Sequence, residues 1–110
     1  MSVFEAIASL NLTCIRETGE QLEVLVQIGR PCQSETGEWA CELSLGRLYP
    51  NLAHIVGEDS LQALCLALSL ARQLLTDFIE TGGRILIAGT DSELPIDAYF
   101  PGVRPASTGS

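Results

Sequence analysis

The histidine of this sequence is the first candidate for chemistry. His54 is the only histidine, and Asp59 follows it closely, so the two could form an acid–base pair that titrates near neutral pH. They lie on either side of Gly57, however, and no nucleophile is spaced to accompany them. A structural or surface histidine is therefore the default interpretation, and a small enzyme that uses His54 is the weakest functional hypothesis.

Acidic and sulfur-bearing residues could in principle hold a metal ion. Asp91, Glu93 and Asp97 could gather around a cation, but calcium loops use more ligands at tighter spacing. The four cysteines lie far apart and form no Cys-x-x-Cys pair, so their spacing does not predict a zinc site. Solvated loop carboxylates are the better interpretation, and we expect no metal, no cofactor and no catalytic residue.

The cysteines also bear on the compartment. The chain starts without a basic segment followed by an apolar run, so we expect no signal peptide, and the apolar run 61–71 is too short to span a membrane. These features predict a cytoplasmic protein with reduced thiols. Cys14, Cys41 and Cys65 are expected to fill the core, whereas Cys32 follows Pro31 in a loop and is expected to be exposed.

Composition and charge limit the partners. The chain has 110 residues, of which 46% are hydrophobic, and this suits one domain with a buried core. Acidic residues number 14 against 6 basic ones, for a net charge of -8. DNA and anionic membranes would be repelled, so we expect neither as a partner. A basic protein is permitted, although solubility alone also explains the charge.

Apolar residues at every second position predict the strands that would position these side chains. The alternation covers residues 10–16 and 21–29, which form a hairpin around Gly19, and it recurs at 39–45 and, briefly, at 53–56. Leu22, Val24, Val26 and Ile28 point to one face. The opposite face is mixed and mostly small or polar, and it carries Glu23, Leu25 and Glu42.

A long helix follows the strands. Asp59 is a good N-cap with Gln62 in the capping-box position, and Gly82-Gly83 stops the helix. The expected inner stripe consists of Leu61, Leu64, Cys65, Leu68, Leu75, Phe78 and Ile79. Leu66 and Leu70 lie on or beside the polar stripe, so they need a second neighbour, either the C-terminal segment or another chain.

The elements together predict an α+β fold. Three or four strands form an antiparallel meander, one long helix covers one face, and residues 84–88 add a short C-terminal strand or extended segment. We expect a single domain over residues 1–101 and a flexible tail over 102–110. Leu66, Leu70, Glu23, Leu25 and Glu42 are the candidate interface residues.

Three strings in the sequence indicate a family. They are Gln27-Ile28-Gly29-Arg30-Pro31, Trp39-Ala40-Cys41 and the segment from Gly57 to Leu64, Gly-Glu-Asp-Ser-Leu-Gln-Ala-Leu. Their pattern, over roughly residues 10–80, resembles a family of short bacterial proteins of unknown function. The resemblance implies a strand meander followed by a helix, and it implies no activity, substrate or catalytic residue.

The sequence leaves two main functional hypotheses. The first is a small acidic, non-catalytic protein-interaction module whose protein partner can be a basic one. The net charge and the row of glutamates between Glu17 and Glu42 motivate this hypothesis. The alternative is a self-associating structural domain, a homodimer that uses Leu66, Leu70 and the apolar run 85–87.

Overall fold

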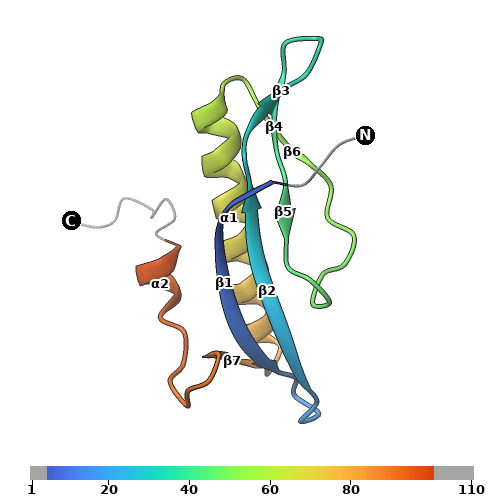
Figure 1. The fold of residues 1–110 in the computed structure, drawn as a ribbon. Helices are drawn as coiled ribbons and strands as arrows, with labels where there is room; N and C mark the ends of the chain where they lie inside the picture. The colour runs from blue at the N-terminus through green and yellow to red at the C-terminus, as the bar shows by residue number, and fades with distance from the viewer. Residues whose placement is uncertain (1–4, 101–110) are drawn as a thin grey trace, which may run out of the picture.

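Residues 5–100, which the computed structural model describes, form two antiparallel sheets and one long helix (Figure 1). The strands are β1 (Ala6–Ile15), β2 (Gln21–Gly29), β3 (Cys32–Gln33), β4 (Trp39–Cys41), β5 (Leu43–Ser44), β6 (Ile55–Gly57) and β7 (Arg84–Ile87), and the helices are α1 (Ser60–Glu80) and α2 (Ile96–Tyr99). The sheets have the orders β5-β2-β1-β7 and β3-β4-β6. The predicted α+β class is confirmed. The tail expected at 102–110 lies outside the described residues.

The long hairpin of β1 and β2 is the centre of the larger sheet. Its partners run in one register from Ala8 opposite Ile28 to Ile15 opposite Gln21. The turn is closed by the Gly19 N–H, which donates to the Arg16 carbonyl at 2.8 Å, and Gly19 has a φ of 96°, which glycine adopts without strain. The alternation in the sequence therefore predicted both the hairpin and its buried face.

The third predicted strand is divided between the two sheets. Its first part, β4, pairs with β3 and β6, while its second part, β5, pairs with β2. Pro31 has no N–H to donate, so the ladder that begins along β2 cannot continue without a break. The last bond before the break runs from the Gly29 N–H to the Glu42 carbonyl, at 2.8 Å. The fourth predicted strand begins at Ile55, so His54 precedes it.

Both predicted ends of α1 are confirmed. The Asp59 carboxylate accepts a hydrogen bond from the Gln62 N–H at 2.7 Å, and the Gln62 side chain accepts one from the Glu58 N–H at 2.7 Å. At the other end the Gly82 N–H donates to Ile79 and the Gly83 N–H to Phe78, at 3.0 and 3.1 Å. With Gly82 at a φ of 103°, this is a Schellman motif.

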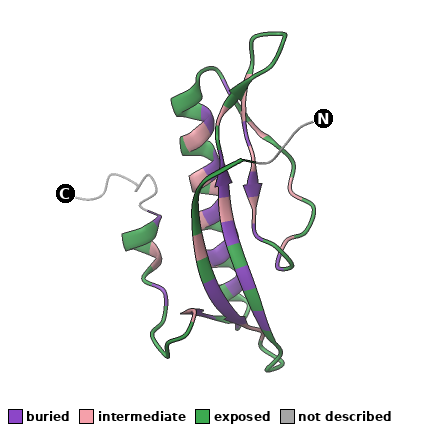
Figure 2. Ribbon diagram, in the orientation of Figure 1, coloured by how far each residue is buried: buried purple, intermediate pink, exposed green. Residues whose placement is uncertain are grey.

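The inner stripe predicted for α1 is confirmed at Leu75 and Phe78 and wrong at Leu61, Cys65 and Ile79. The buried residues are Ala63, Ala67, Ala71, Leu75 and Phe78, whereas Leu61, Cys65 and Ile79 are exposed (Figure 2). Alanines let the helix backbone approach the strands closely. A Cβ added to Gly57 of β6 would lie only 2.6 Å from the Ala63 nitrogen. Half-buried leucines flank this face and pack on the core: Leu64, Leu68, Leu70 and Leu74.

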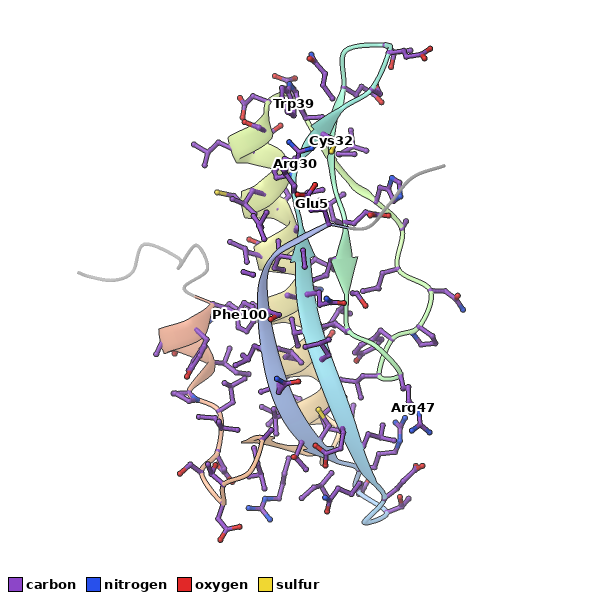
Figure 3. All side chains as sticks on the ribbon, viewed as in Figure 1. Glu5, Arg30, Cys32, Trp39, Arg47 and Phe100 are labelled. Atoms are coloured by element: carbon purple, nitrogen blue, oxygen red, sulfur yellow. The ribbon has the colours of Figure 1, made fainter. Side chains whose placement is uncertain are left out.

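The C-terminal segment closes one edge of the larger sheet. β7 pairs with β1, as expected for residues 84–88, and the chain then doubles back, with the Leu94 N–H donating to Ile85 at 2.9 Å. An ion pair between Arg72 of α1 and Asp97 of α2 connects the two helices. Phe100, which follows α2 and is labelled in Figure 3, is buried. Neither helix described over residues 5–100 combines the length and apolar character needed to cross a membrane.

Candidate functional site

The face of the larger sheet opposite α1 is the surface with the most candidate residues. Buried and exposed residues alternate along β2 (Figure 2). Because successive side chains of a strand point to opposite faces of the sheet, the exposed ones lie on the face opposite the buried core. Glu23 and Leu25, two of the predicted interface residues, both lie on this outer face, and Leu25 is 40% exposed. We call this surface the outer face; it is the side turned toward the viewer in Figure 1.

A hollow of about 740 Å³ lies on the outer face near the β1–β2 turn. It is lined by residues of β1, β2, β7 and the turn after β7: Thr13, Ile15, Gln21, Glu23, Arg84, Leu86, Gly89, Thr90 and Asp91. Thr13 is only 8% exposed, and its hydroxyl donates to a Glu23 carboxylate oxygen at 3.1 Å. The Gln21 amide donates to the other oxygen at 3.4 Å. The Glu23 carboxylate is therefore held in place by two neighbours.

The charges around this hollow are mainly negative. Glu23 and Asp91 line it, and Arg84, its one lining cation, lies 3.5 Å from the Glu93 carboxylate. Two carboxylates thus line the hollow against one guanidinium, which itself has a carboxylate partner, so the lining carries a net negative charge. The hollow is therefore suited to a cationic or hydrogen-bond-donating group.

Glu42 and His54 form a second polar feature. The His54 Nε2 lies 3.1 Å from a Glu42 carboxylate oxygen, and both side chains are exposed to solvent. Asp59, the partner considered from the sequence, instead caps α1. Neither Glu42 nor His54 lines the hollow. The structure thus pairs the histidine with a different carboxylate and places that pair away from the residues around Glu23.

The helix residues Leu66 and Leu70 occupy a separate surface. Leu70 is half-buried and packs against the core, while Leu66 is 43% exposed. On the same flank of α1, the Tyr49 hydroxyl donates to the Leu74 carbonyl at 3.3 Å, so the segment after β5 covers this flank. Leu70 is thereby packed within its own chain. The sheet separates both leucines from Glu23 and Leu25.

Sequence reasoning missed several residues of the hollow. Arg84 and Leu86 belong to β7, and Asp91 belongs to the turn that follows it. For these segments the sequence predicts only a short strand or extended segment and a loop with solvated carboxylates. Leu86 pairs with Thr13, so its side chain lies on the outer face, unlike those of Ile85 and Ile87. The run Arg-Ile-Leu-Ile is apolar at three successive positions, so it contains no alternation that could have assigned a face.

Two of the three loop carboxylates considered for a cation are paired with an arginine. Glu93 lies beside Arg84, Asp97 pairs with Arg72, and Asp91 lines the hollow. Within residues 5–100, no group of three or more histidine, cysteine or acidic side chains is placed to hold a metal ion.

The thiols divide into buried and exposed pairs. Cys14 and Cys41 are buried as expected, and Cys32 is exposed as expected, but Cys65 is exposed, contrary to the prediction. Burial raises the pKa of Cys14 to about 11, with a further contribution from the charge of Glu23. Burial also raises the pKa of Cys41. Both buried thiols are therefore poor nucleophiles near neutral pH.

Thiol labelling tests this division. We expect the native protein to react rapidly with Ellman's reagent at Cys32 and Cys65 only, and at Cys14 and Cys41 only after unfolding, because the thiolate must be both formed and accessible. The double variant Cys32→Ser/Cys65→Ser is the control and should show no rapid phase. Rapid reaction of Cys32 alone would instead place Cys65 in the core.

The geometry of residues 5–100 defines a small α+β protein in which one face of the larger sheet has no covering element among these residues and carries an acidic hollow. The chain belongs to the DUF6968 family, a domain of unknown function, which is matched over residues 8–96. This assignment agrees with the resemblance to a family of unknown function, and it extends the matched region beyond Gly83 through β7. No curated protein and no solved structure matches the chain.

Proposed function

We propose that this protein is a non-catalytic interaction module that binds a basic segment of a partner protein on the outer face. The observation that carries the proposal is the Glu23 carboxylate, which Thr13 and Gln21 hold in a mainly acidic hollow on an uncovered face. A carboxylate already positioned by its neighbours loses little conformational entropy when it accepts a bond from Lys or Arg.

The overall charge supports the same class of partner. With a net charge of -8, long-range attraction favours a basic protein and disfavours nucleic acid or an anionic membrane. Leu25 adds an exposed apolar side chain beside Glu23 on the same face, whereas Glu42, which pairs with His54 away from the hollow, adds only to the overall negative charge. The partner surface should therefore combine basic and apolar side chains.

A binding measurement with a defined probe tests this proposal. The probe is a fluorescein-labelled short peptide of alternating Lys and Val, compared by fluorescence anisotropy with its Glu-Val counterpart. We expect only the basic peptide to bind, and Glu23→Gln to weaken it by roughly twofold to fivefold, since one partly exposed ion pair contributes up to about 1 kcal/mol. Binding should also weaken as salt is raised.

The matched control is Glu35→Gln, which removes one negative charge from the exposed loop between β3 and β4. It changes the net charge equally but leaves the hollow intact, so it should weaken the peptide by much less than Glu23→Gln does. Equal effects of the two variants would mean that only net charge matters. That result, or no binding of the basic peptide, would count against the proposal.

A second candidate function is self-association through α1, because Leu66 and Leu61 expose large apolar side chains on this helix. For this candidate we expect a dimer in sedimentation at tens of micromolar and a shift to monomer in Leu66→Lys. A wild-type monomer at that concentration would remove it.

A further inference from the structure

The two edges of the larger sheet differ. At the β7 edge, the chain itself adds residues 92–94, through hydrogen bonds from the Ile87 N–H to Ser92 and from the Leu94 N–H to Ile85, both at 2.9 Å. At the opposite edge, β5 pairs with β2 at Gln27 and Ile28, and the Gly29 N–H donates to the Glu42 carbonyl just before β5. Among residues 5–100, no strand pairs with the remaining part of this edge, from Gln21 to Leu25 (Figure 1). We call this part the open edge.

The hydrogen-bond pattern of the hairpin decides which backbone groups point to the open edge. The Arg16 N–H donates to the Glu20 carbonyl, which makes these two residues a hydrogen-bonded pair. In an antiparallel ladder, hydrogen-bonded pairs alternate with non-hydrogen-bonded pairs. The next hydrogen-bonded pairs along the hairpin are therefore Cys14 with Leu22 and Leu12 with Val24, so Leu22 and Val24 direct their N–H and C=O groups toward β1. The backbone groups of Gln21, Glu23 and Leu25 therefore point to the open edge.

The same three residues have their side chains on the outer face. The middle of the open edge thus presents a free backbone donor and acceptor together with the positioned Glu23 carboxylate. At one end, Gly46 faces Leu25, with its Cβ position 3.8 Å from the Leu25 nitrogen and oxygen. Arg47 follows at that end, to the right of β2 in Figure 3. Because Gly46 already lies against the Leu25 backbone, the open edge can accommodate a strand of about four residues, or roughly 13 Å.

Charge selects the occupant of this edge. A second copy paired about a two-fold axis at Glu23 would place two carboxylates directly opposite each other, with their Cβ atoms about 5 Å apart, and like charges at this distance are destabilising. A Lys or Arg at the same position would form a favourable cross-strand pair. Self-pairing in this register is therefore disfavoured, and a foreign strand with a basic residue opposite Glu23 is favoured.

We propose that β2 takes up an extended basic segment of a partner protein as an added antiparallel strand along Gln21–Leu25, with a Lys or Arg of that segment opposite Glu23. This inference rests on the proposed function and specifies how the outer face would bind. Backbone bonds to the edge would contribute affinity, and the pair at Glu23 would contribute selectivity.

Selective N-methylation of the Lys-Val probe tests strand addition without altering the protein. In an antiparallel added strand with its lysines on the outer face, the lysine N–H groups point to β2 and the valine N–H groups point to solvent. We expect methylation of the lysine nitrogens to weaken binding at least tenfold and methylation of the valine nitrogens to change it little. Each methylated peptide is the conformational control for the other.

The outcomes separate this inference from the proposed function. Loss on valine methylation alone would indicate a parallel strand and overturn the antiparallel arrangement. Equal tolerance of both methylations, with Glu23→Gln still weakening the unmodified peptide, would overturn strand addition but leave outer-face binding in place. Absence of any binding that depends on Glu23 would overturn both.

Discussion

Replacement of Leu75 by alanine is expected to lower the free energy of unfolding by about 2–5 kcal/mol. Leu75 is fully buried at 0% exposure, on the inner face of α1 and within the main hydrophobic core. Its truncation removes buried methyl and methylene groups and leaves a cavity that close-packed neighbours can fill only in part. Urea denaturation followed by far-UV circular dichroism measures this loss.

The matched control for Leu75→Ala is Leu61→Ala in the same helix. Leu61 is 68% exposed, so its truncation exchanges one good helix former for another and removes little buried surface. We expect a change within about 0.5 kcal/mol. If the two variants lost similar stability, Leu61 would have to be buried as well, as the stripe predicted from the sequence requires.

The second large effect is expected for Gly57→Ala. A Cβ at this position would lie 2.6 Å from the Ala63 nitrogen and 3.0 Å from its Cα, and these are backbone atoms of the first turn of α1. Backbone cannot rotate away as a flexible side chain can, so β6 and the helix must separate. We expect a loss of about 1–3 kcal/mol or more, measured by the same denaturation experiment.

Val56→Ala is the control for this variant. Val56 precedes Gly57 in β6 and is half-exposed, so its truncation tests the strand without touching the close approach to α1. The loss should stay below about 1 kcal/mol, the span of strand preferences. A Gly57→Ala protein as stable as Val56→Ala would contradict the close packing of β6 against the helix.

Local signals in the sequence predicted the parts of the fold that depend on near neighbours. The alternation along β1 and β2 predicted the hairpin, because side-chain direction in a strand reverses at every residue. Asp59 and the Gly82-Gly83 pair predicted the two ends of α1, because a cap satisfies backbone groups only a few residues away. Of the candidate site, Glu23 and Leu25 were placed on the outer face by the same alternation.

Only the C-terminal part of the inner face of α1, Leu75 and Phe78, was predicted correctly in this way. Leucine occurs on nearly every side of the helix, so hydrophobic periodicity does not identify one face. The short distance between α1 and the strands decides which residues of the helix face the sheet, and it favours Ala63, Ala67 and Ala71 over the larger leucines. Cys65 is exposed for the same reason.

The sequence by itself thus determined the hairpin, the ends of α1 and the acidic character of the surface, since these follow from residue order and composition. Only the tertiary structure decided that Thr13 and Gln21 hold Glu23, that β7 completes the hollow, and that the edge from Gln21 to Leu25 stays open. Each of these depends on which distant strands become neighbours, and such pairing depends on packing of the whole chain rather than on local pattern.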